Sequence, residues 1–334
     1  MKILSRFPKH VVRVLSCYWV VLPEPLTEII LQTIPFFAII ALGYGAGRSG
    51  FFGAEATAYL TRFVFYFALS AMLFRFAANL ALEEVLDWQF MGAYLTGCVI
   101  VYLLATAIAL LRKRGLAEAA VEAQCAIIGN VGFLGIPMLV LLLGDAAIGP
   151  VMMVLAVDLV IFSSLIVILI TASREGSVGL QTIGVVIAGL FKNPMVVSIV
   201  LGFGCAALSL TIPAPVDTFL DLLGSAATPG ALFAIGASLA GKSAERISVA
   251  SWLTLCKLVI HPLVVAIFAL WIFEIELFAA GVMIAAAALP VAGNVFMIAQ
   301  TYNVAPARAS AAILLSTTLS IVTLPIVIAW VTSL

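Results

Sequence analysis

Apolar runs about as long as a bilayer is thick recur along the whole chain, and they limit its fold more than any other feature. A transmembrane helix needs about 20 predominantly apolar residues. Only 10% of the residues are charged, against roughly 25% in a soluble domain. A membrane barrel would alternate apolar and polar residues, and these runs do not. The sequence therefore predicts an all-α polytopic membrane protein. We predict ten transmembrane helices, at 27–47, 56–77, 88–111, 117–142, 148–172, 194–212, 217–240, 248–272, 277–302 and 309–332.

Several function classes are not supported, because the sequence lacks the residues that they require. The net charge is zero, so nothing indicates nucleic acid as a partner. Five scattered cysteines and two histidines, without a CxxC pair, support no metal site or cofactor. No Walker-type phosphate loop is present, and neither HExxH nor GxSxG occurs. We therefore expect neither ATP use nor enzymatic activity, with no catalytic residues and no metal ligands.

Charged residues in the connections orient the predicted spans. Connections after odd-numbered spans hold the basic residues Arg48, Arg112, Lys113, Arg114, Arg174, Lys192, Lys242, Arg246 and Arg308. Connections after even-numbered spans hold only the acidic residues Glu83, Glu84, Asp87, Asp145, Asp217, Asp221, Glu274 and Glu276. By the positive-inside rule, the odd-numbered connections face the cytoplasm. Both ends of the ten-helix core then face outward across the cytoplasmic (inner) membrane. Residues 1–25, which carry four basic residues on that outer side, are treated as an extension of uncertain role.

The chain also matches itself at a shift of 159 residues. This shift places "ALSAMLFRFAANL" (68–80) over "ATPGALFAIGASL" (227–239), and it aligns spans four and five with spans nine and ten. A repeat of five spans, an odd number, must insert its second copy upside down. We therefore predict two inverted five-helix repeats, 26–172 and 194–334, joined by a cytoplasmic linker at 173–193. Inverted repeats are typical of secondary transporters.

Spans four and nine carry helix-weakening residues at matching places of the two repeats. Their interruptions read "GNVGFLGIP" (129–137) and "LPVAGN" (289–294). Proline removes a backbone donor, and glycine lets the backbone turn or approach a neighbour closely. Irregular backbone at membrane depth is tolerated where it is buried in protein or lines a cavity, although a lone kink often serves packing. The predicted substrate-binding residues are Asn130, Gly132, Gly135, Pro137, Pro290, Gly293 and Asn294. Half-helix N-termini there would suit an anion such as a carboxylate.

Ionisable residues inside the predicted spans are candidates for coupling to H⁺ or Na⁺. Asp158 lies in span five, and its alternative role is a structural hydrogen bond or ion pair. Lys257 and His261 lie four residues apart on one face of span eight. They could pair with Asp158, counter the charge of a substrate or, for Lys257, snorkel to the surface. Arg62 and Arg75 are predicted to be snorkelling anchors, with anion attraction by Arg75 left open. Further polar residues have weaker predictions: a polar lining for Gln300, Tyr302 and Asn303, and helix packing for Ser316, Thr317 and Thr318.

Together, these segments resemble the auxin efflux carrier family, which includes plant auxin carriers and bacterial malonate-type permeases. The resemblance is carried by "PFFAIIALGYGAGRSG", "RFVFYFALSAMLF", "GNVGFLGIP", "KNPMVV", "TPGALFAIGASLA", "KLVIHP" and "LPVAGNVFMIAQTY". It implies a fold similar to the sodium–bile acid symporters, with broken helices four and nine crossing. It also implies a scaffold of helices 1, 2, 6 and 7, a transport domain of helices 3–5 and 8–10, an elevator motion and a homodimer. The family usually has a proline in span two, where this chain has Ser70, so we expect a straighter span two. In span seven, Pro229 is the counterpart of that proline and is present in this chain.

The function predicted from these observations is secondary active transport of a small organic anion, such as malonate or an auxin-like acid. Substrate identity, direction and coupling ion stay open. Alternatives are a sodium-coupled carrier resembling the bile acid symporters, a channel, or a membrane enzyme. Apart from the substrate and the lipid bilayer, the expected partner is a second copy of the chain.

Overall fold

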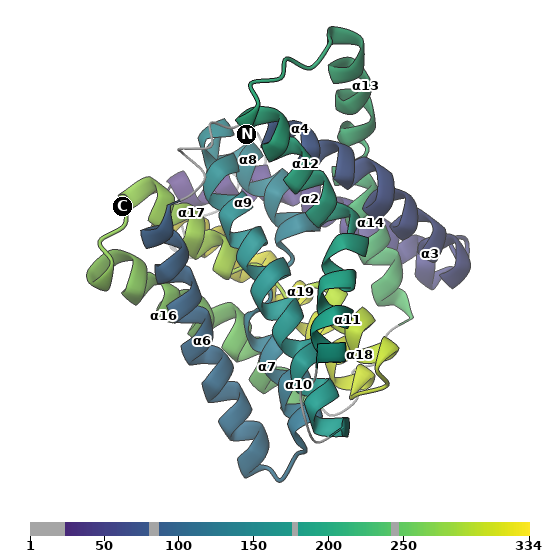
Figure 1. The fold of residues 1–334 in the computed structure, drawn as a ribbon, viewed down its shortest axis with the longest axis vertical. Helices are drawn as coiled ribbons and strands as arrows, with labels where there is room; N and C mark the ends of the chain where they lie inside the picture. Colours follow the sequence, from purple (N-terminus) through teal and green to yellow (C-terminus); the bar gives the residue numbers. More distant parts are fainter. Residues whose placement is uncertain (1–23, 80–86, 176–179, 242–246) are drawn as a thin grey trace, which may run out of the picture.

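The computed structural model describes residues 24–79, 87–175, 180–241 and 247–334. Within these ranges every regular element is a helix, as predicted, and the β-pairing is one isolated bridge between Gly129 and Val291. Most of the predicted extension 1–25 lies outside the described residues, as do the loop residues Glu83, Glu84, Lys242 and Arg246. Figure 1 shows the helices packed around one another, with α13 projecting from one end.

Each predicted span of the first half corresponds to one helix or to consecutive helical pieces. The pieces are joined by π-helical or 3₁₀ turns, or by a short break. These elements are α2 (Glu24–Arg48), α3 (Ala54–Phe63), η2 (Val64–Ala68), α4 (Leu69–Ala78), α6 (Trp88–Leu111), α7 (Leu116–Ile127), η3 (Val131–Gly135), α8 (Ile136–Leu143), η4 (Asp145–Ala147), α9 (Ile148–Val157), η5 (Asp158–Phe162) and α10 (Ser163–Glu175).

The second half is built in the same way. Its elements are α11 (Leu180–Lys192), α12 (Pro194–Ala207), α13 (Ala214–Ser225), α14 (Ala227–Ala240), α15 (Ile247–Leu255), η6 (Cys256–Ile260), α16 (His261–Ile267), η7 (Phe268–Ile272), α17 (Leu277–Ala287), α18 (Gly293–Thr301) and α19 (Pro306–Val331).

By length and composition, the described residues hold seven helices that could each cross a membrane, or eight if one bent pair counts as a span. The bent pair joins Ile183–Lys192 to Pro194–Ala207 at 72°. The predicted linker 173–193 is therefore largely helical, and α12 ends before the predicted limit of 212. The two remaining predicted spans, 117–142 and 277–302, are interrupted, and their halves are too short to cross a bilayer alone.

Many helix contacts lie within two sets. In one set, α14 packs on α2 and α3, while α4 packs on α12 and α13; in the other, α6 contacts α7 and α16, and α19 contacts α15 and α17 (Figure 1). The two sets also contact each other, because α2 packs on α19 and α8, and α14 packs on η3. The α2–α14 contact brings the two backbones together: a Cβ atom on Gly236 would lie 1.9 Å from the Ile40 carbonyl oxygen, and one on Gly43 would lie 2.1 Å from that of Phe233. Small residues allow such close packing of membrane helices.

Span two is continuous from Ala54 to Ala78, but it is not a regular α-helix. The turn Val64–Ala68 is π-helical, and the Ser70 hydroxyl donates to the Phe65 carbonyl at 3.0 Å. Where a proline would remove a backbone donor, this chain uses a wider turn whose carbonyl is satisfied by a hydroxyl. Such π-helical turns are rare and are frequently found at functional sites.

Candidate functional site at the helix crossover

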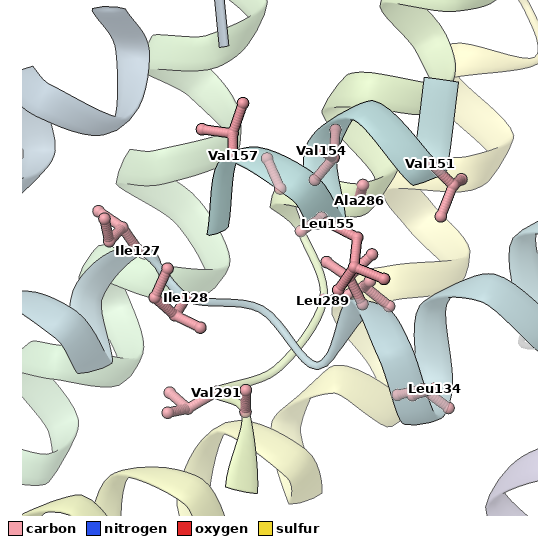
Figure 2. Close-up of a cluster of buried hydrophobic side chains, with 14 of the residues drawn as sticks. Ile127, Ile128, Leu134, Val151, Val154, Leu155, Val157, Ala286, Leu289 and Val291 are labelled. Carbon is pink, nitrogen blue, oxygen red and sulfur yellow. The ribbon is translucent and has the colours of Figure 1, made fainter. Parts of the chain in front are cut away.

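The two breaks meet and pair with each other. The backbone of Ile128 and Ala292 is extended. The Asn130 amide donates to the Pro290 carbonyl at 2.8 Å, and the Ala292 amide donates to the Ile128 carbonyl at 3.1 Å. Figure 2 shows the two extended segments side by side, one after Ile128 and one before Val291. We call residues 128–130 and 290–292 the crossover. Its backbone groups, which leave their helices at membrane depth, satisfy one another.

A third helix supports the crossover. The Val291 amide donates to the hydroxyl of Ser316, on α19, at 3.1 Å, and that hydroxyl donates to the Ile313 carbonyl at 3.3 Å. Ser316 is fully buried. The predicted packing role of this hydroxyl therefore has a specific backbone partner. Thr317 is buried, whereas Thr318 is exposed and bonds the carbonyl one turn earlier.

Apolar side chains surround the crossover. Leu134, Leu155 and Leu289 point towards the paired segments in Figure 2, and all three are at least 95% buried. Water is excluded from such packing, so polar groups here interact in a low-dielectric environment. Electrostatic interactions between groups at the crossover are therefore stronger than they would be in water.

The predicted glycines differ in their surroundings. A Cβ atom on Gly129 would lie 3.1 Å from the Ala286 carbonyl oxygen, one on Gly132 would lie 2.7 Å from Met195 Cε, and one on Gly135 would lie 2.5 Å from Leu289 Cδ1. Close approach to a backbone therefore accounts for Gly129, whereas Gly132 and Gly135 lie against the ends of side chains. Nothing lies within 4 Å of a Cβ atom on Gly293. Of the two predicted uses of glycine, close approach therefore does not apply to Gly293, which lies at the start of α18 directly after the break.

The two prolines also have different roles. Pro290 lies in the crossover and its carbonyl is an acceptor there. Pro137 lies in the first turn of α8, which continues directly from η3. The helical hydrogen bonds start earlier, since the Asn130 carbonyl accepts from the amides of Leu134 and Gly135 at 3.0 and 2.9 Å. Pro137 therefore does not make the break in span four; residues 128–130 do.

Both predicted asparagines lie where a new helix begins. Asn130 is 7% exposed and directly precedes η3, and its side chain makes no capping hydrogen bond. Asn294 is in the first turn of α18, and its Oδ1 atom is buried without a partner. The first amides of each helix, at Val131 and Gly132 and at Gly293 and Asn294, have no intrahelical acceptor. The crossover thus brings together two helix N-termini, each with a side-chain amide.

Asp158 begins the π-helical turn η5 and is 3% exposed. The hydroxyl of Tyr94, on α6, donates to Asp158 Oδ1 at 3.0 Å. Asp158 Oδ2 is buried and has no hydrogen-bond partner. The carboxyl group is therefore held on one side only, which leaves an acceptor for a proton or a cation. Tyr94 was not predicted, although it lies on a predicted span.

Lys257 is fully buried in the π-helical turn η6, so it does not snorkel. Its ammonium donates to the carbonyl of Ala287 and lies 3.3 Å from His261 Nδ1. The predicted pair with Asp158 is not formed by contact; the Tyr94 hydroxyl bonds Asp158 instead. His261 Nε2 contacts Cys98 Sγ at 3.2 Å. Cys98 is buried, and it lies one helical turn after Tyr94 on α6. That spacing of two polar side chains on one face was the available signal for both.

A buried ion cluster lies outside the predicted site. Glu122, on α7, is fully buried and pairs with Arg112 and with Arg308, 2.8 Å away on α19. Arg308 also contacts Glu118 at 2.9 Å. Arg308 was counted only as a loop charge, yet it ties the start of α19 to α7. The spacing of Glu118 and Glu122, one helical turn apart, was the available signal.

Arg75 has partners that were not predicted. Its guanidinium contacts Asp217 at 2.7 Å and Asp221 at 2.5 Å, both on α13. It lines a small cavity of about 150 Å³ together with Met72, Phe76, Leu220, Asp221, Gly224, Ser225 and Thr228. Two carboxylates thus hold Arg75 between α4 and α13, and its snorkelling stays a prediction. Of the weaker predictions, the Tyr302 backbone carbonyl accepts from Arg174, and Gln300 is exposed.

Comparison with known proteins decides the family. A family model described as "Membrane transport protein" matches residues 28–328. The chain belongs to this family. The resemblance to auxin efflux carriers is thereby confirmed, and the chain is a multi-pass membrane transporter.

Two relatives cover nearly the whole chain. A protein of Rhizobium meliloti (strain 1021) named "Putative malonate transporter" is 31% identical over 89% of this chain and 94% of its own length. A protein of Escherichia coli (strain K12) named "Uncharacterized transporter YfdV" is 27% identical over 90% of this chain and 97% of its own length. Both names describe transporters rather than enzymes.

Proposed function

We propose that this chain is a secondary active transporter of small organic anions, with carboxylates such as malonate as the first class to test. The observation that carries the proposal is the meeting of two helix N-termini, each with an asparagine, at the paired breaks. Helix N-termini favour anions because their free amides and dipoles present partial positive charge. Asn130 and Asn294 would add directed donors for carboxylate oxygens. The name of the Rhizobium relative supports the substrate class.

The proposed architecture is ten spans in two inverted repeats. If each interrupted segment and the bent pair count as one span each, the observed elements correspond to the ten predicted ranges. The pairing at the crossover supports the inverted relation, because an antiparallel bridge is exchanged with itself by a two-fold axis through its centre. Transporters with inverted-topology repeats hold substrate near the midplane at such broken helices.

The proposed mechanism is an elevator-type alternation of access in the inner membrane, with both ends of the core outside. The two sets of helix contacts support a division into a scaffold (helices 1, 2, 6 and 7) and a transport domain (helices 3–5 and 8–10), which would meet where α2 contacts α19 and α14 contacts η3. The close backbone contact between α2 and α14 supports their place in one scaffold. A homodimer formed through the scaffold belongs to the same proposal. Asp158 is the proposed coupling residue, since one of its oxygens is buried without a partner.

The proposal is tested by uptake of radiolabelled malonate and a panel of organic acids into proteoliposomes. We expect saturable uptake in the wild type and a loss of about tenfold or more in Asn130→Ala/Asn294→Ala, since each lost hydrogen bond to a charged group is worth about 1.5–3 kcal/mol. Asn79→Ala is the matched control, because Asn79 is exposed and bonds the Arg75 carbonyl away from the crossover. Unchanged uptake in a folded double variant would exclude the crossover as the substrate site.

A further inference from the structure

The ammonium of Lys257 lies at the crossover rather than at a membrane surface. It donates to Ala287 O, and Ala287 is the last residue of α17. A Cβ atom on Gly129 would lie 3.3 Å from Lys257 Nζ. The positive charge is therefore held between the C-terminal end of one half-helix and the break of the other broken span.

The C-terminal end of a helix attracts cations. Its last carbonyls have no amide partners and carry partial negative charge. In secondary transporters, half-helix C-termini and unwound carbonyls near the midplane coordinate the coupling Na⁺ or H⁺. In this chain, the group at the end of α17 is the amine of a lysine side chain.

We propose that the Lys257 ammonium takes the place of a coupling sodium ion at the end of α17, so that transport does not require Na⁺. This inference extends the proposed function, and it rests on the proposal that the chain is a secondary transporter. A sodium ion at this helix end would need the same carbonyl oxygen. The ammonium and the ion would also repel each other at this buried place, so the lysine excludes the ion.

The groups around Lys257 include one carboxyl group, that of Asp158. Tyr94 and Cys98, on α6, connect it to the lysine: Tyr94 bonds Asp158, and Cys98 contacts His261, which in turn contacts Lys257. His261 adds no negative charge. One carboxylate is thus matched by one ammonium, and the free oxygen of Asp158 can still accept a proton.

The test is thermal unfolding of the purified protein in detergent, in NaCl and in choline chloride at equal ionic strength and fixed pH. It does not depend on any substrate, so it separates this inference from the proposed function. We expect the wild type to unfold at the same temperature in both salts. Lys257→Ala removes the ammonium and opens the helix end, so NaCl should raise its unfolding temperature by about 2–4 °C over choline chloride, the shift that saturating binding of a weak ligand produces.

Matched controls make each outcome decisive. Lys192→Ala removes an exposed lysine at the end of α11 and should show no difference between the salts. Ethylammonium chloride should stabilise Lys257→Ala, because it restores the missing group without the tether.

Sodium-specific stabilisation of the wild type would overturn the proposal. A well-folded Lys257→Ala that responds to neither Na⁺ nor ethylammonium would also overturn it, since the lysine would then be only a helix cap. If Lys257→Ala does not fold, the wild-type measurement, together with malonate uptake in both salts, still decides the question.

Discussion

The two broken spans make the same backbone pairing, but the groups around them differ. Each contributes one donor and one acceptor to the bridge between Gly129 and Val291. Their surroundings differ: the break in span four is tightly packed at its glycines, whereas Gly293 in span nine faces open space. The end of α17 holds the Lys257 ammonium, but at the shift of 159 residues the position of Lys257 corresponds to Cys98. The two breaks thus share their backbone pairing but differ in the charge and the open space around them.

The largest expected effect comes from the charge difference. At the same shift, Asp158 corresponds to Thr317. Asp158→Asn keeps the shape of the side chain but removes the buried carboxylate to which the Tyr94 hydroxyl donates, and a hydrogen bond to a charged group is worth about 1.5–3 kcal/mol. Thr317→Val should cost less than about 1.5 kcal/mol, because it removes at most one neutral hydrogen bond. The free energies of unfolding of both variants in detergent measure this difference. Equal losses of stability would mean that the Asp158 carboxylate contributes no more to stability than Thr317 does.

A smaller effect should separate the packed glycine from the open one. Gly129→Ala places a methyl group 3.1 Å from the Ala286 carbonyl and should destabilise the protein by about 1–3 kcal/mol, as overpacking does. Gly293→Ala meets nothing and should be neutral or stabilising by up to about 1 kcal/mol, because alanine reduces the freedom of the unfolded chain. Thermal unfolding of the two single variants provides the comparison. Equal destabilisation would contradict the different packing of the two breaks.

An effect of similar size concerns the support given by α19 to span nine. Ser316→Ala removes the acceptor of the Val291 amide, and an unsatisfied buried donor costs about 1–3 kcal/mol. Thr318→Ala, on the same helix but exposed, should change stability by less than about 0.5 kcal/mol. Amide hydrogen exchange should detect faster exchange at residue 291 in Ser316→Ala. Unchanged exchange at residue 291 would show that the hydroxyl is dispensable.

Much of the fold could be predicted from the sequence because a bilayer imposes length and polarity directly on each span. The ranges 88–111 and 248–272 agree closely with helices ending at Leu111 and Ile272. Interruptions by Gly and Pro located both breaks within a few residues. Residue 137 was misleading, because a proline is tolerated in the first turn of a helix as well as at a break.

The partners of the site residues could not be predicted in the same way. Whether Lys257 reaches Ala287 or Asp158 depends on the rotation of span eight about its axis, and a π-helical turn alters that rotation. Tyr94, Cys98 and Glu122 acquire polar partners only because α6 and α7 pack beside helices far along the chain. The open surroundings of Gly293 likewise depend on helices that a one-dimensional pattern does not place.

The bridge at the crossover also sets an order of events during synthesis. Asn130 donates to Pro290, a residue 160 positions later in the chain. At about 5–20 residues per second, a ribosome needs roughly 10–30 s to reach that partner. Until then, the newly inserted first half has a broken helix whose amide and carbonyl have no acceptor or donor of their own. A translocation or quality-control factor that binds irregular membrane segments would therefore encounter this chain in a defined time window, which closes when span nine is inserted.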